Sequence, residues 1–338
     1  MENCVKEILN WYLENKRELP WRKDQDPYHV WISEVMLQQT RIEAVIDYYY
    51  RFLEKIPDIQ SLSEISDDKL LKLWEGLGYY SRARNLKKAA IQIMEEFDGI
   101  FPNQYEDILS LAGIGEYTAG AISSICYNLV HASVDGNVMR VYCRVCDLDL
   151  DVSDLKVKKE IKRKIEAILP KNSGDFNQGI MELGEMICLP NGVPKCGECP
   201  LQMKCLAHLK GRESLIPRKV SKKEKSEEEY TLFLIKCGKK YALHKREEGL
   251  LKNMWEFPNL EGFLTFDEVE EKIPGILRVE TGITNTHIFT HKKWFMNSYY
   301  IEVHEELDSY QWFSLDEIEK NYALPTAFRP FFDYLVKK

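Results

Sequence analysis

The sequence predicts a mainly α-helical N-terminal region, residues 1–210, followed by an α+β domain, residues 230–338. In the first region, apolar residues recur every three or four positions, as on one face of a helix. From Tyr230 onward they alternate as in strands, and residues 211–229 between the two regions have the polar composition of a linker. A chain of 338 residues can build two such cores.

The N-terminal helices are placed by their apolar periodicity and by their end signals. Pro27 precedes a helical run expected from about Tyr28 to Leu53, and residues 155–169 form another helix before a proline. Asp67 and Asp68 are placed to cap a further helix.

The C-terminal elements predict a mixed or antiparallel sheet with a few helices. A hairpin is expected around Cys237-Gly-Lys, because strand-like runs flank these turn residues. The other expected strands are Gly282–Phe289 and Trp294–Val303, and the expected helices are Thr265–Lys272, Leu315–Asn321 and Thr326–Val336.

Charge and cysteine content bear on the binding partners and on the cellular compartment. The net charge of −8 does not favour nucleic acid, but eight Lys/Arg residues fall within residues 204–225, and a local basic face can still bind DNA. Nine cysteines without a secretory leader argue for a reducing compartment. No apolar stretch approaches about 20 residues, so no membrane span is expected. We expect a cytoplasmic protein, associated with the nucleoid if its source is prokaryotic.

A cysteine-rich loop gives the first chemical signal. Four cysteines lie within 18 residues: Cys188, Cys196, Cys199 and Cys205. Four thiolates suit a [4Fe–4S] cluster or zinc, and the single short Cys-x2-Cys knuckle favours iron–sulfur over zinc. A second Cys-x2-Cys pair, Cys143 and Cys146, lies in a helical stretch and is read as a structural thiol pair.

Two glycines mark a tight turn between helical patterns. Gly113 and Gly115 in LAGIGEYTAGAI can expose backbone amides at a helix N-terminus, where a phosphate would bind without any charged side chain. A helical corner that binds nothing is the alternative.

Two carboxylates stand out. Glu34 interrupts an otherwise apolar helix face, and Asp135 precedes an expected helix at residues 137–146. Each has an ordinary explanation: Glu34 as a solvated side chain, Asp135 as an N-cap. Together they meet the requirement of glycosidic cleavage, in which one carboxyl protonates the leaving group and the other stabilises the sugar cation.

In combination these motifs closely resemble the MutY-type adenine DNA glycosylases, which belong to the helix-hairpin-helix superfamily and carry an iron–sulfur cluster. The resemblance covers nearly the whole chain. It is carried, in order, by SEVMLQQTR, LWEGLGYYSRARNLKKAA, LAGIGEYTAGAI, VDGNVMR, the four-cysteine loop, WEFP and ALPTAFRP.

The resemblance implies an activity and a partner. It implies a monomer that removes adenine paired with 8-oxoguanine or G in double-stranded DNA. Glu34 then resembles the acid that protonates adenine N7 and later activates water, and Asp135 the carboxylate that meets the sugar cation. Tyr117 and Asn137 resemble groups that support this chemistry.

The resemblance also implies DNA contacts. Gln39 and Tyr79 resemble residues inserted into the duplex at the lesion, and the adenine pocket would include Trp21, Arg22 and Glu182. The hairpin at Gly113 and Gly115 would hold a phosphate, often with a bridging monovalent cation. Ala112 replaces the usual proline before this turn.

One position separates the family from its endonuclease III-like relatives. Those enzymes carry a lysine two residues after the second glycine, and its amine forms a Schiff base and cuts the strand. This chain has Tyr117 there, which predicts a monofunctional glycosylase.

The C-terminal half resembles a Nudix-like domain without the REx2EE carboxylates that bind magnesium. It is therefore expected to read the base opposite adenine. Phe289, Thr290 and His291 resemble the loop that contacts 8-oxoguanine, with Thr290 in place of the usual serine. These three residues could also simply end a strand.

Other interpretations stay open. The seven residues between Cys188 and Cys196 exceed the family's usual six, and this insertion should bulge outward near Pro190-Asn-Gly192. A pyrimidine-lesion glycosylase-lyase, a non-catalytic or redox-sensing DNA-binding protein and, more weakly, a Nudix phosphohydrolase are the competing functions.

Overall fold

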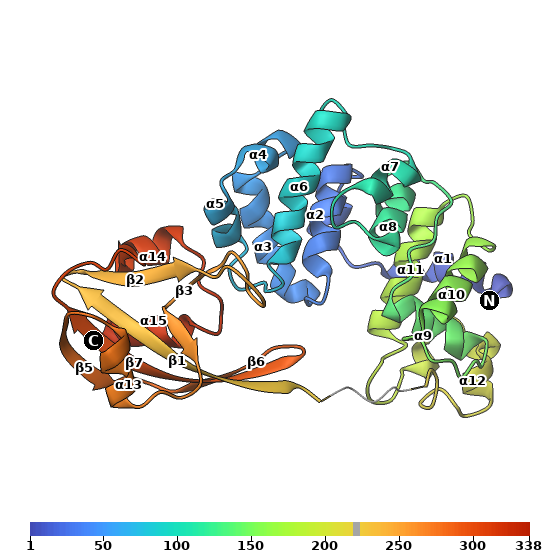
Figure 1. Ribbon diagram of the computed structural model, residues 1–338. Coiled ribbons are helices and arrows are strands. Elements are labelled where there is room, and N and C mark those ends of the chain that lie inside the picture. Colours follow the sequence, from blue (N-terminus) through green and yellow to red (C-terminus); the bar gives the residue numbers. More distant parts are fainter. Residues whose placement is uncertain (219–223) are drawn as a thin grey trace. The chain divides into compact units, whose positions relative to one another are not determined.

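The computed structural model describes residues 1–218 and 224–338 (Figure 1). Residues 219–223, part of the expected linker, lie outside the described residues. The chain forms two compact units, residues 1–64 with 85–221 and residues 65–84 with 222–338. Within the described residues, no helix has the length and apolar character needed to cross a bilayer.

The first unit is helical, as predicted. The short α12 and the 3-10 turns η3 and η4 belong to the cysteine-rich loop. Its elements are η1 (Glu2–Cys4), α1 (Val5–Asn15), η2 (Pro20–Arg22), α2 (Pro27–Leu37), α3 (Ile42–Lys55), α4 (Ile59–Glu64), α7 (Tyr105–Ser110), α8 (Glu116–Tyr127), α9 (Gly136–Val145), α10 (Leu155–Glu166), α11 (Ser173–Met186), η3 (Cys196–Glu198), η4 (Gln202–Lys204) and α12 (Leu206–Leu209), with most of α6 (Ser81–Glu96).

Two expectations about helix ends were wrong. The single helix expected over residues 28–53 is broken into α2 and α3, because the backbone of Gln39 adopts a left-handed conformation with φ of 58°. Asp67 and Asp68 do not cap α5 (Asp67–Leu73) but occupy its first turn, after the N-cap Ser66. In this position their negative charges interact favourably with the helix dipole.

Close helix packing places the functional segments of this unit. A Cβ at Gly184 of α11 would lie 2.6 Å from the Cβ of Asn137 in α9, so glycine permits these two helices to approach. The core beneath them includes Val138, Val141, Phe176 and Leu183, all buried. The N-terminus of α9 is therefore fixed against α11.

The second unit contains α5 and all the strands. Its elements are α5 (Asp67–Leu73), β1 (Ser226–Cys237), β2 (Lys240–Lys245), β3 (Trp255–Glu256), β4 (Asn259–Glu261), α13 (Phe266–Lys272), β5 (Ile276–Thr281), β6 (Asn285–Ile288), β7 (Lys292–Val303), β8 (Gln311–Ser314), α14 (Leu315–Asn321) and α15 (Arg329–Lys337).

The sheet is mixed, with the main order β3-β2-β1-β7-β5. β1 and β2 form the expected hairpin, with Cys237 opposite Lys240, while β1 and β7 run parallel from Ser226–Lys292 to Lys236–Glu302. β1 is buried on both faces: Leu232 and Leu234 pack in the core that includes α15, and Phe233 and Ile235 in the core that includes α13. The short strands β3, β4, β5 and β8 were not foreseen.

Candidate active site and cysteine loop

A cavity of about 1120 Å³ in the helical unit collects most of the residues expected at the site. It is large enough to receive a nucleoside. Its lining includes Trp21, Arg22, Glu34, Gln39, Gly115, Tyr117, Asp135, Asn137 and Glu182. Of the other expected residues, Gly113 lies in the hairpin beside this cavity, and Tyr79, Phe289, Thr290 and His291 belong to the second unit.

Glu34 sits in the middle of α2, whose residues are almost all buried. Its side chain is only 8% exposed, and its Oε2 atom has no hydrogen-bond partner among the described residues. Burial raises the pKa of Glu34 to about 7, and the negative charge of Asp135 acts in the same direction, while the Tyr117 hydroxyl and Arg22 oppose it. The carboxyl can therefore hold a proton near neutral pH.

Asp135 is the N-cap of α9, as the sequence suggested. Its Oδ1 accepts a hydrogen bond from the backbone N–H of Val138 at 2.8 Å, and its Oδ2 accepts one from Asn137 Nδ2 at 2.8 Å. Burial raises the pKa of Asp135 above its usual value, although these two hydrogen bonds oppose the shift because they favour the anion. Asp135 thus has a hydrogen-bond donor at each oxygen, whereas one oxygen of Glu34 has none among the described residues.

Tyr117 and Asn137 complete this corner of the cavity. Burial and the two neighbouring carboxylates raise the pKa of Tyr117 well above its usual value, so its hydroxyl stays protonated. Asn137 is fixed at both ends, since its Oδ1 accepts a hydrogen bond from Arg140 Nη2 at 2.7 Å. Arg140 in turn donates from Nε to the carbonyl of Cys188 at 2.7 Å, which ties Asp135 to the cysteine loop.

The remaining expected pocket residues form an ion-pair network. Glu182 is buried and receives Arg17 Nε on one carboxylate oxygen at 2.8 Å and Arg22 Nη2 on the other at 2.5 Å. Burial raises the pKa of Glu182, but the two arginines more than offset this and lower it. Trp21 packs edge-on against Tyr49 nearby.

The two residues expected to enter the duplex share an unusual backbone. Seven described non-glycine residues have positive φ, and four of them are Asn or Asp, which tolerate it. The other three are Gln39, Tyr79 and Leu251, with φ of 58°, 47° and 68°. Residues held in such conformations are often found at functional sites, because surrounding structure must maintain the strain.

In the second unit, the predicted reader loop and Tyr79 meet. The Tyr79 hydroxyl lies 2.6 Å from Thr290 Oγ1. Phe289 is half-buried against Trp294, with ring centroids 4.8 Å apart, while Thr290 and His291 are exposed. Phe289 therefore anchors the loop, and Thr290 and His291 present two polar side chains at its surface.

The glycine hairpin joins α7 and α8. Gly113 has φ of 77°, and a Cβ there would lie 2.5 Å from Asn85 Cβ, so the turn requires glycine on both counts. Gly115 is the N-cap of α8, and its surroundings are open. The first amides of α8 point out of the helix without intrahelical acceptors, as at every helix N-terminus.

The four cysteines of the loop line one small cavity with Arg144, His208 and Glu213. All four are unpaired thiols. Cys188 Sγ lies 3.2 Å from Arg144 Nη1, and Cys199 Sγ accepts from the Leu201 N–H at 3.4 Å. Burial and mutual repulsion of the thiolates raise the pKa of Cys199 to about 12. The insertion at Pro190-Asn-Gly192 is exposed, as expected of an outward bulge.

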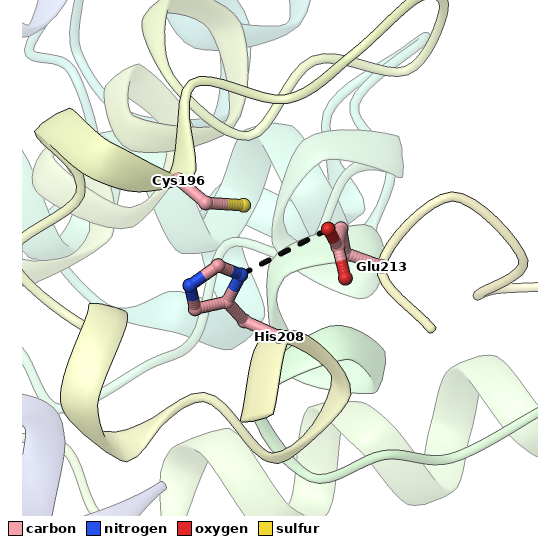
Figure 2. Close-up of side chains that lie close together, drawn as sticks. All are labelled: Cys196, His208 and Glu213. Atoms are coloured by element: carbon pink, nitrogen blue, oxygen red, sulfur yellow. Dashed lines mark ion pairs between the residues drawn. The ribbon is translucent and has the colours of Figure 1, made fainter. Parts of the chain in front are cut away.

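Figure 2 shows three of the residues that line this cavity. Cys196, His208 and Glu213 point toward one another, and their ligand atoms lie within 4.8 Å of each other. His208 Nδ1 is 3.8 Å from Glu213 Oε1, too long for a hydrogen bond. Two buried polar atoms, His208 Nδ1 and Glu213 Oε2, have no hydrogen-bond partner among the described residues.

Sequence reasoning missed several residues of the site. Gln178, Met181 and Glu185 line the cavity from the same face of α11 as Glu182, at the spacing of successive helical turns. That spacing around Glu182 could have revealed them. Arg140 was present in the VDGNVMR motif, but no local signal indicates its bond to Cys188, 48 positions away.

Comparison with known proteins gives a consistent assignment. Residues 32–170 match the HhH-GPD superfamily of base excision DNA repair proteins, and residues 230–334 match the NUDIX domain. The chain is 41% identical to the adenine DNA glycosylase of Buchnera aphidicola subsp. Schizaphis graminum over 257 residues, covering 75% of this chain and 74% of that protein. Over 309 residues it is 35% identical to the human adenine DNA glycosylase, covering 75% of this chain and 56% of the human protein.

Among solved structures, a thermostable thymine-DNA glycosylase matches 61% of this chain and 95% of its own, with a TM-score of 0.56 and 28% identity. An endonuclease III from a DNA complex matches 62% of this chain and 95% of its own, with a TM-score of 0.53. Its 22% identity supports the fold alone. With both domains matched and the relatives covering most of its length, the chain belongs to the MutY-type family of adenine DNA glycosylases.

Proposed function

We propose that this protein removes adenine paired with 8-oxoguanine or G in double-stranded DNA, by acid-assisted cleavage of the N-glycosidic bond. One observation carries the proposal. Two buried carboxyls line the same cavity: Asp135 accepts a hydrogen bond on each of its oxygens, whereas Oε2 of Glu34 has no partner among the described residues. Glu34 then serves as the acid and Asp135 as the charge that faces the sugar.

The chemistry requires both groups because adenine leaves poorly as an anion. The base must first rotate out of the duplex at a cost of a few kcal/mol, and the cavity supplies the space for it. Glu34 transfers its proton to N7, electrons of the glycosidic bond move to the base, and the sugar becomes an oxocarbenium-like cation. Asp135 stabilises this cation, and Glu34, now ionised, accepts a proton from the attacking water.

The other site residues support this reaction. Asn137 orients Asp135, and Tyr117 contributes a neutral hydroxyl beside both carboxyls. Tyr117 has no amine with which to form a Schiff base, so the proposed enzyme is monofunctional. Trp21, together with the surfaces of Arg22 and Glu182 that their ion pairs leave open, would contact the extruded adenine.

The cysteine loop fits a [4Fe–4S] cluster better than zinc. In tetrahedral zinc sites, Zn–S bonds of about 2.3 Å bring the sulfurs to within roughly 4 Å of each other. Among the described residues, however, the one group of three ligands within 4.8 Å is Cys196, His208 and Glu213, so the four thiols are spread more widely. Burial disfavours free thiolates in this loop, and bonds to the iron atoms of a cluster would delocalise their negative charge.

The DNA contacts follow from the same proposal. The hairpin at Gly113 and Gly115 would bind a phosphate through the amides of α8, with a monovalent cation nearby. Gln39 and Tyr79 would enter the duplex, and Phe289, Thr290 and His291 would read 8-oxoguanine. We propose a monomer that works in the cytoplasm, on nucleoid DNA if the source is prokaryotic.

Single-turnover assays on A·8-oxoguanine and A·G duplexes test the proposal. The wild-type protein should release adenine, Glu34→Gln should not, and Glu54→Gln, which removes an exposed carboxylate on α3, should behave as wild type. Tight binding to the mispair without adenine release by the wild-type protein would favour a non-catalytic role. Borohydride trapping on damaged pyrimidines would favour a glycosylase-lyase.

A further inference from the structure

The segment formed by residues 65–84 groups with the C-terminal sheet, although it lies between helices of the first unit in sequence. It contains α5 and ends near Tyr79. Its contacts within the second unit include specific hydrogen bonds and ion pairs. Some of them involve the WEFP and ALPTAFRP motifs, to which neither the mechanism nor the reader loop assigns a role.

The first contact joins α5 to β3. Asp68 Oδ1 accepts a hydrogen bond from Trp255 Nε1 at 2.9 Å and lies 3.0 Å from Lys245 Nζ. The same lysine ammonium lies 4.9 Å from the centre of the Trp255 ring. Trp255 is buried, so its indole N–H needs an acceptor, and Asp68 supplies it.

The second contact joins the end of α5 to the chain after α14. Glu75 Oε1 accepts a hydrogen bond from the backbone N–H of Leu324 at 2.9 Å. Lys72 Nζ donates to the carbonyl of Tyr322 at 3.3 Å and pairs with Glu75 at 2.6 Å. Side chains at the end of α5 and just beyond it thus bind backbone groups on both sides of Ala323.

A short hydrogen-bonded turn carries this attachment to Tyr79. Trp74 Nε1 donates to the Gly78 carbonyl at 3.1 Å, and Arg82 Nη2 donates to the carbonyls of Leu77 and Gly78 at 3.0 and 3.1 Å. These bonds flank Tyr79, whose backbone has a positive φ and whose hydroxyl meets Thr290.

We propose that Asp68, Lys72 and Glu75 are positioning residues that hold Tyr79 against the loop of Phe289, Thr290 and His291. We call their contacts with Trp255, Lys245, Tyr322 and Leu324 the latch. In this proposal, which rests on the proposed function, preference for 8-oxoguanine over G requires the latch, because the inserted side chain and the reader loop must be held as one piece. Adenine chemistry at Glu34 does not require it.

Hydrogen exchange on the DNA-free, full-length protein tests whether the latch holds the segment. Asp68→Ala should raise exchange in residues 65–80 while leaving α8 unchanged. The matched control is Asp316→Ala, since Asp316 occupies the same second position of another seven-residue helix in this unit but is exposed and, among the described residues, pairs with Lys320 of its own helix. Trp255→Phe removes the indole donor, and Trp312→Phe removes the comparable indole bond to the Leu307 carbonyl as its control.

Single-turnover adenine release tests the consequence. Asp68→Ala and Trp255→Phe should lower the ratio of rates for A·8-oxoguanine over A·G by about tenfold, the usual scale for losing a hydrogen bond to a charged group. The A·G rate itself should stay near wild type, and the two controls should keep the wild-type ratio. A uniform loss on both substrates is the result of a merely structural role and would overturn the proposal.

The two measurements separate this proposal from the function beneath it. Unchanged exchange in residues 65–80 of both latch variants overturns the latch, whether or not adenine is released. Raised exchange with an unchanged ratio of rates overturns its role in specificity. A wild-type protein that releases no adenine from either duplex overturns the proposed function and this role with it, while the exchange result still decides whether the segment is held.

Discussion

Glu34 and Asp135 carry the same functional group but are placed to behave differently. Glu34 is surrounded by the buried face of α2 and leaves one oxygen without a partner, whereas Asp135 accepts two hydrogen bonds at the start of α9. The residue types and motif positions were predictable from the sequence. The assignment of Glu34 as the acid and Asp135 as the anion was also expected, but the individual partners, such as the amide of Asn137 and the unpartnered Oε2 of Glu34, were not, because these contacts form only in the folded chain.

A dependence of the rate on pH follows from the acid role of Glu34. Its pKa of about 7 means that the protonated form declines as pH rises through neutrality. Single-turnover adenine release should therefore fall above about pH 7 and approach a tenfold loss per pH unit. DNA affinity measured over the same range should not fall in parallel. A rate that stays level from about pH 6 to about pH 9 would contradict the assignment of Glu34 as the acid.

The same burial predicts that Glu34→Gln, an inactive variant, gains stability relative to wild type as pH rises. Folding raises the pKa of Glu34 from 4.5 to about 7, so the folded protein binds this proton more tightly than the unfolded chain. The resulting contribution to stability is complete below pH 4.5 and is lost as pH rises through about 7. Glu34→Gln cannot ionise, so its free energy of unfolding relative to wild type should improve by about 3 kcal/mol between pH 4.5 and pH 7.5. Urea unfolding at the two pH values measures this.

Two controls decide this stability prediction. Glu54→Gln, at an exposed position, should show no such dependence on pH. A difference between Glu34→Gln and wild type that is the same at both pH values would mean that folding does not raise the pKa of Glu34, and the prediction would fail.

At the scale of elements, the sequence located most helices but not the break between α2 and α3. Pro27 and the capping role of Asp135 were readable because proline and N-cap residues act locally. The break falls at Gln39, where no glycine or proline marks it in the sequence. The surrounding fold holds the left-handed backbone there. The residue expected to enter DNA is thus also the one that local rules failed to place.

The glycine hairpin permits a test that separates backbone strain from crowding. Gly113 and Gly192 share φ of 77°, but a Cβ at Gly113 would lie 2.5 Å from Asn85 Cβ, whereas Gly192 faces open space. Gly192→Ala should cost about 1 kcal/mol of unfolding free energy from the backbone alone. Gly113→Ala should cost roughly 2 kcal/mol more, because the turn must shift.

Thermal unfolding and DNA titration measure the two effects of this hairpin. Since the shifted turn would misplace the first amides of α8, Gly113→Ala should also bind duplex DNA more weakly, while Gly192→Ala should bind as wild type. Equal losses of stability and affinity in the two variants would show that the hairpin amides are not a phosphate site.

At the scale of the whole molecule, the grouping of residues 65–84 with the C-terminal sheet could not be read from local patterns. The apolar spacing of this segment is simply helical, as in the rest of residues 1–210. Among the contacts that attach it are single polar bonds, from Asp68 to Trp255 over 187 positions and from Glu75 to Leu324 over 249. Periodicity and turn signals describe neighbours in sequence, so they give no information on such pairs.

Hydrogen bonds link the cysteine loop to Asp135, so loss of the loop's cofactor should impair the reaction. The carbonyl of Cys188 accepts a hydrogen bond from Arg140, which holds Asn137 and through it Asp135. The purified protein should contain roughly four iron atoms per chain and the broad visible absorbance of a [4Fe–4S] cluster. Cys199→Ser should lose the iron, the absorbance and adenine release together, because without the cluster the loop no longer fixes this chain of bonds. Cys237→Ser, at the end of β1, should lose none of them. Stoichiometric zinc in place of iron, or full iron content in Cys199→Ser, would contradict the assignment.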